Sequence, residues 1–88
     1  MASKKNLKKD INYVLGDIIE AVYIWEATHP EKGTKDSEKV IDEAIAVFDD
    51  LIQKLNDRKA ENKKQHFTSI HQELESKGRG LIEKINAL

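Results

Sequence analysis

Apolar residues recur every three or four positions in three separate stretches of this 88-residue chain. This interval is the period of an α-helix that buries one face, whereas a half-buried strand would alternate apolar and polar residues. The chain has one proline and four glycines, which are too few for a β-sandwich or barrel, since their strands are separated by frequent turns. The sequence therefore predicts an all-α fold.

The first predicted helix covers residues 4–28. Its apolar positions fall within about 100° of arc, the width of one stripe that faces a core. His29 and Pro30 should end this helix, because the residue before a proline is disfavoured in the α conformation. The apolar stripe consists of Leu7, Ile11, Val14, Leu15, Ile18, Val22 and Trp25.

The second predicted helix covers residues 37–56, with Asp36 or Ser37 as its N-terminal cap. Its apolar stripe spans about 160°, which is wider than contact with one helix requires. We therefore expect this helix to pack against two neighbours, with Phe48 and Leu51 near the centre of the stripe. The apolar positions are Val40, Ile41, Ala44, Ile45, Val47, Phe48, Leu51, Ile52 and Leu55.

The third predicted helix covers residues 63–86. Asn62 followed by Gln65 resembles a capping box with asparagine as the cap. Gly78 lies on the apolar stripe and should let a neighbouring backbone approach closely, whereas Gly80 lies off the stripe and has no evident packing reason. The other positions of the stripe are Phe67, Ile70, Leu74, Leu81, Ile85 and Leu88.

Three amphipathic helices joined by two short loops predict a single domain over residues 1–88, folded as an antiparallel three-helix up-down-up bundle. An alternative remains open, because residues 56–66 contain neither glycine nor proline. The second and third helices could fuse into one rod. The chain would then be a helical hairpin that dimerises to bury its apolar face.

Charge is unevenly distributed along the chain. Residues 1–9 hold four lysines and no acid, residues 10–57 have a net charge of −8, and residues 58–88 have a net charge of +3. This pattern favours charge pairing between neighbouring helices. The alternative is a patch that meets a partner of opposite charge.

Cysteine is absent, so neither a disulfide framework nor a thiolate metal site is expected. The basic N-terminus leads into no apolar segment of the kind that secretory signals contain. The longest apolar runs, residues 21–25 and 44–48, are far shorter than the roughly 18 residues of a membrane span. We therefore expect a cytoplasmic, bacterial protein with no membrane partner.

No pattern typical of an active site or a cofactor site is present, so we predict neither an enzyme nor a bound cofactor or metal. His66 and His71 are five residues apart and diverge around a helix. Glu26 and His29 form one Glu-x-x-His pattern, whereas di-iron bundles need two. His71 keeps a phosphorelay-type function open as an alternative, although the lysine and glycine that follow it stand a helical turn too far along the chain.

Two surfaces are candidates for binding a partner. An apolar flank beside the first helix's stripe suits contact with another protein or with a second copy of the chain; it consists of Tyr13, Ile19, Tyr23 and Ile24. A basic patch could contact nucleic acid, which is the less expected partner because the sequence pI is near 6.3. This patch consists of Lys4, Lys5, Lys8, Lys9, Arg58, Lys59, Lys63 and Lys64.

Residues 9–20, 62–67 and 81–86 resemble segments of small uncharacterised bacterial all-helical proteins. The resemblance covers most of the chain and rests on no functional motif, so it implies a helical fold and no activity. We therefore expect a non-enzymatic interaction or structural protein that acts by surface contact. A nucleic-acid accessory protein is the second expectation.

Overall fold

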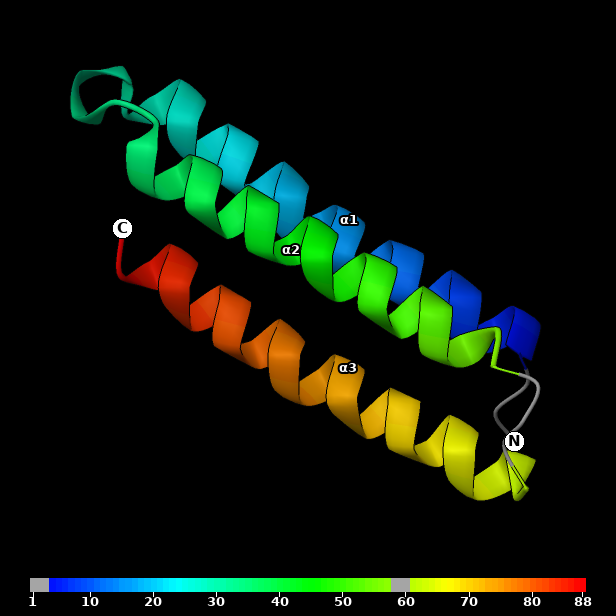
Figure 1. Cartoon of the computed structure of the whole chain (residues 1–88). Coiled ribbons are helices and arrows are strands. Elements are labelled where there is room, and N and C mark those ends of the chain that lie inside the picture. Colours follow the sequence, from blue (N-terminus) through cyan, green and yellow to red (C-terminus); the bar gives the residue numbers. More distant parts are fainter. Residues whose placement is uncertain (1–3, 58–60) are drawn as a thin grey trace.

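Three long helices pack side by side in the computed structural model, which describes residues 4–57 and 61–88 (Figure 1). They are α1 (Lys4–Thr28), α2 (Lys35–Leu55) and α3 (Lys63–Asn86), and a short 3₁₀ turn, η1 (Pro30–Lys32), precedes α2. Successive helices are antiparallel, so α1 and α3 begin at the same end of a rod of 50 × 19 × 17 Å. The predicted all-α up-down-up bundle is confirmed, and no strand occurs in the two described ranges.

The alternative with fused second and third helices is wrong. The helix α2 ends at Leu55, α3 begins at Lys63, and α3 turns back along α2. Asn62 caps α3 as predicted, since its Oδ1 accepts a hydrogen bond from the backbone N–H of Gln65 at 3.1 Å. His66 Nε2 lies 2.6 Å from the carbonyl oxygen of Lys54, so it can donate to one of the carbonyls that the last turn of α2 leaves unpaired.

The predicted cap of α2 is wrong, because the helix begins at Lys35 and its N-cap residue is Thr34. Ser37 instead lies fully buried within the first turn. Its Oγ lies 2.5 Å from Glu26 Oε2 on α1 and 3.0 Å from the carbonyl oxygen of Thr34. The hydroxyl that the sequence assigns to capping therefore joins the ends of α1 and α2.

The three predicted stripes meet in one core along the axis of the bundle. Leu51 is fully buried at its centre, but Phe48 is only half-buried at its edge, so placing Phe48 in mid-stripe is a wrong prediction. The buried apolar side chains are Leu7, Ile11, Leu15, Ile18, Val22, Val40, Ala44, Val47, Leu51, Leu55, Ile70, Leu74 and Leu81.

Gly78 is buried where α3 crosses α1, as its place on the stripe predicts. A Cβ atom at this position would lie 3.3 Å from Val14 Cγ1, which is tighter than ordinary van der Waals contact. A Cβ atom at Gly80 would have no heavy atom within 4 Å apart from the nearby backbone of its own helix. Gly78 thus permits the close approach of the two helices, while Gly80 has no such role.

Charged side chains join α2 to α3 along their shared edge. Lys54 Nζ lies 2.8 Å from Glu73 Oε1, Lys77 Nζ lies 3.9 Å from Asp50 Oδ2, and Lys84 pairs with Glu43. The last two pairs match the predicted attraction between acidic and basic helices, and the first has the opposite polarity. Of the six ion pairs between described residues, these three join α2 to α3, and the other three lie within α2 or within α3.

The Lys54–Glu73 pair should make stability depend on acidity. Hydrogen bonding from Lys54, reinforced by Lys77 and opposed by partial burial, lowers the pKa of Glu73 from its ordinary 4.5. A carboxylate with a lowered folded-state pKa stabilises the fold above its unfolded pKa, and this contribution is lost as the pH falls through the folded value. The pair is partly exposed, so the contribution should be below about 1 kcal/mol.

We therefore expect Glu73→Gln to lower the free energy of unfolding at pH 7, and we expect the difference from the wild type to shrink as the pH drops below 4.5. Urea denaturation at several pH values measures this difference. Glu83→Gln is the control, because Glu83 is exposed on the same helix and outside these ion pairs. An unchanged difference between pH 7 and pH 3 would contradict the assignment.

Candidate protein-interaction surface

The exposed apolar side chains lie along the two grooves beside α1. The α2–α3 groove is bordered by the charged side chains of Glu43, Lys77 and Lys84, which form ion pairs there. The large apolar side chains that remain about half exposed border α1 instead: Tyr13 (61%), Tyr23 (56%), Ile24 (57%), Ile45 (47%) and Ile82 (49%). Two of the three grooves of the bundle therefore offer apolar surface.

The groove between α1 and α2 is lined by two matching rows of side chains. Spacing of four, three and four residues places positions 12, 16, 19 and 23 in a row on α1, and positions 41, 45, 48 and 52 in a row on α2. Asn12, Leu15, Gly16, Ile19, Ile45 and Phe48 line its centre. We call this surface the α1–α2 face, defined by Asn12, Gly16, Ile19, Tyr23, Ile41, Ile45, Phe48 and Ile52.

The groove between α1 and α3 is more polar. Tyr13 and Ile82 stand on opposite sides of it, above the contact of Gly78 with Val14, and charged side chains also line it. His71 lies here, with its Nδ1 3.5 Å from Glu75 Oε1 on the next turn of α3. Nothing in this arrangement singles out His71 as a phosphate acceptor, and the phosphorelay alternative stays a prediction.

The structure divides the predicted apolar flank between the two grooves. Tyr13 and Tyr23 are exposed in different grooves, and Ile24 is exposed on α1. Ile19 is half-buried and packs against the core, so it offers less exposed surface than the other three residues, and its role in a partner surface stays a prediction. Its angle on the helix points it toward α2, whose Ile45 and Phe48 line the same groove.

The sequence missed three residues of these surfaces. The periodicity assigns Ile45 to the buried stripe of α2, but it lies at the edge of that wide stripe, where a neighbour covers it only in part. Ile82 stands one position after the buried Leu81 and carries no periodic signal. Gly16 is exposed in the middle of α1 with no heavy atom within 4 Å of its Cβ position, so nothing inside the described chain requires a glycine there.

The two separated parts of the predicted basic patch meet at one end of the rod. Because α1 and α3 begin at the same end, Lys4 and Lys63 line one hollow, together with His66, Phe67 and one acid, Asp57. Neither helix has an acid in its first turn, and each helix N-terminus adds a partial positive charge. Lys5, Lys8, Lys9 and Lys64 are exposed nearby on the same helices, while Arg58 and Lys59 lie outside the described residues.

Among residues 4–57 and 61–88, no group of three or more His, Cys, Asp or Glu side chains could hold a metal ion. In the Glu-x-x-His pattern, His29 contacts its own helix: its ring stacks on Trp25 with ring centroids 4.9 Å apart. His29 Nδ1 also lies 3.0 Å from the carbonyl oxygen of Trp25. None of the described helices is long and apolar enough to span a bilayer.

Comparisons with protein families, with curated proteins and with solved structures found no match to this chain. The resemblance of three segments to small bacterial helical proteins therefore stays a prediction. What the chain binds has to be inferred from its own surface.

Proposed function

We propose that this chain is a non-enzymatic interaction protein that binds protein partners through α1 and the grooves on both sides of it. The supporting observation is the segregation of exposed side chains around the bundle: apolar groups border α1, whereas ion pairs line the α2–α3 groove. Burial of apolar surface contributes about 25 cal/mol per Å². Tyrosine is also enriched in the cores of interfaces, and both tyrosines of the chain are exposed on α1.

Site-specific photo-crosslinking in the native host tests this proposal. A photoreactive phenylalanine analogue replaces Tyr23 or Ile24 on α1, and in the control it replaces Ala46, which is exposed beside the α2–α3 groove. We expect protein adducts from the two α1 positions and few or none from Ala46. Equal labelling from all three positions, or no protein adduct from α1, would overturn the proposal.

Binding of a polyanion at the basic end is a second candidate function, which corresponds to the nucleic-acid accessory role. The observation that favours it is the meeting of Lys4 and Lys63 at one hollow, where two helix N-termini also lie. The same photoreactive group at Lys5 discriminates between the two functions. A nuclease-sensitive adduct at Lys5, with no protein adduct at Tyr23, would support the second candidate and contradict the first.

The expected location is the cytoplasm of a bacterial cell. The absence of cysteine supports this location.

A further inference from the structure

We propose that the α1–α2 face binds a second copy of this chain in antiparallel orientation, as a two-fold symmetric dimer. This inference rests on the proposed function and names one partner for one of its grooves. Four observations carry it: the two rows of side chains, the position of Gly16, the charge distribution along α1, and the area of the face.

The two rows make the face largely apolar, with the polar side chain of Asn12 at one end of the α1 row. The spacing of four, three and four residues on each helix is that of a coiled-coil seam. Ile19 and Phe48 form the half-buried floor, while Tyr23 and Ile45 rise from it with about half their surface exposed. A second helix pair could insert its own Ile45 and Tyr23 side chains against this floor.

Gly16 stands at the midpoint of α1, twelve residues from Lys4 and twelve from Thr28. A two-fold axis that passes near Gly16 at right angles to the rod would lay the face on its own copy and bring the two glycines close together. Glycine in an exposed helix interior costs about 1 kcal/mol relative to alanine. The open space around its Cβ position shows that the described chain gains no packing from this residue, whereas close approach of a second α1 would use it.

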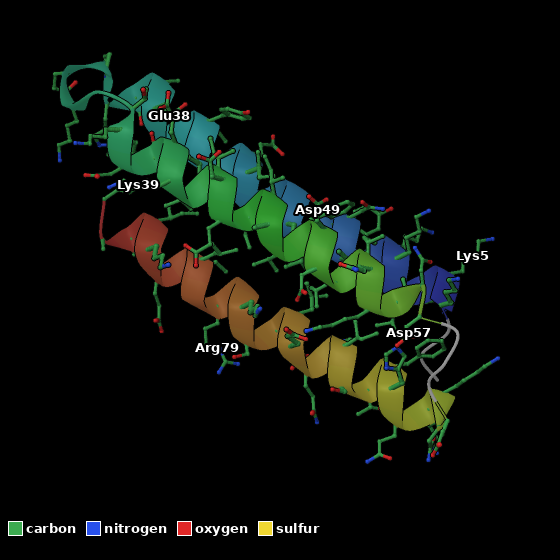
Figure 2. All side chains as sticks on the ribbon, in the orientation of Figure 1. Lys5, Glu38, Lys39, Asp49, Asp57 and Arg79 are labelled. Carbon is green, nitrogen blue, oxygen red and sulfur yellow. The ribbon has the colours of Figure 1, made fainter. Side chains whose placement is uncertain are left out.

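Charge selects the antiparallel orientation. The helix α1 has four lysines in residues 4–9, and in residues 10–28 it has four acids and no base. None of these eight charges forms an ion pair with another described residue. The antiparallel dimer lays α1 on α1 and would set Lys5 and Lys9 of one copy beside the acidic half of the other. Figure 2 shows Lys5 at the end of the rod opposite Glu38.

The face is large enough for a stable dimer. The whole side of the rod that carries this face measures 50 by 19 Å, or about 950 Å², against roughly 800 Å² per partner in a standard interface, so the dimer interface would extend along the rod beyond the eight residues that define the face. The exposed apolar groups lie near its centre and the lysines of α1 lie toward one end, while Asp17 and Glu20 stand in the middle of the helix. An apolar centre is typical of protein interfaces.

Sedimentation equilibrium of the purified chain tests self-association. We expect a species near twice 10.1 kDa that dissociates on dilution. Ile45→Glu should weaken the dimer by about tenfold or more, because it puts a charge in the apolar centre. Ile82→Glu is the matched control, since Ile82 has a similar exposure in the other groove and should leave the dimer intact. Circular dichroism shows that both variants are folded.

Single cysteines test the orientation, because the chain has no cysteine of its own. Positions 5, 16 and 27 are eleven residues apart and share one side of α1, since eleven residues make about three helical turns. In the antiparallel dimer, Gly16→Cys forms a disulfide with its own copy, while Lys5→Cys pairs only with Ala27→Cys in a mixture. A disulfide between two copies of Lys5→Cys would overturn the antiparallel arrangement.

The outcomes separate this inference from the proposed function. A chain that is monomeric at millimolar concentration, together with crosslinks from Tyr23 to a different protein, overturns self-association and leaves the interaction function standing. A monomeric chain with no protein adduct at Tyr23 or Ile24 overturns both. Loss of the dimer in Ile82→Glu and not in Ile45→Glu would move the interface to the α1–α3 groove and contradict the face proposed here.

Discussion

Replacing Leu51 by alanine is expected to lower the free energy of unfolding by about 2 to 5 kcal/mol, because the change removes buried methyl groups and leaves a cavity. Leu51 has none of its surface exposed and lies among side chains from all three helices. The total stability of an 88-residue domain is on the order of 4 to 13 kcal/mol. This single change should therefore remove a large share of it, as measured by urea denaturation.

Phe48→Ala is the matched comparison for Leu51→Ala. Phenylalanine is the larger side chain, so volume alone would make its loss more costly. Because Phe48 is only half-buried at the edge of the core, we expect its loss to cost about 1 to 2 kcal/mol, in proportion to the area it buries. The measurement is made at a concentration at which the chain is monomeric. A greater loss from Phe48→Ala than from Leu51→Ala would mean that the core is centred elsewhere on α2.

The core positions could be predicted because helical periodicity is a local property of the sequence. On α1, five residues of the predicted stripe are buried as expected: Leu7, Ile11, Leu15, Ile18 and Val22. The stripe of α2 is wider, and its width alone does not tell which edge a neighbour covers. Ile45 remains about half exposed for this reason, whereas Val47 on the other side of the stripe is buried toward α3.

Interactions between helices were harder to predict, since they depend on distance and not on periodicity. The expected attraction between acidic and basic helices agrees with the Asp50–Lys77 pair, but the charge of a whole segment could not indicate which residues would meet, or that Lys54 on the acidic helix would meet Glu73 on the basic one. The role of Ser37 was missed because its hydroxyl reaches Glu26, eleven residues away in the chain. Such a contact becomes visible only when the turn between α1 and α2 is known.

The basic patch illustrates the opposite case, in which topology and charge together predict a surface. Lysines near residue 5 and near residue 63 are far apart in the chain, but an up-down-up bundle begins its first and third helices at the same end. The structure accordingly brings Lys4 and Lys63 to one hollow. The surfaces beside α1 could not be predicted from topology and charge alone, since each groove combines edge residues from two helices and depends on how closely those helices pack.

Replacing Gly78 by leucine is expected to destabilise the bundle, because it forces α3 away from α1. A Cβ atom would already lie 3.3 Å from Val14 Cγ1, and the rest of a leucine side chain would have to separate α1 from α3. Overpacking of a core costs about 1 to 3 kcal/mol. The intrinsic helix preference of leucine over glycine, worth a little under 1 kcal/mol, would offset part of that cost.

Gly80→Leu isolates the packing contribution, since it makes the same chemical change two residues along the same helix. No heavy atom lies within 4 Å of the Cβ position there, so only the gain in helix preference of a little under 1 kcal/mol should remain. Subtracting the two urea-denaturation free energies cancels this preference and leaves the clash with Val14. We expect Gly78→Leu to be less stable than Gly80→Leu by about 1 to 3 kcal/mol. Equal stabilities would mean that α1 and α3 do not make this close contact, and the width of the α1–α3 groove would then have to be revised.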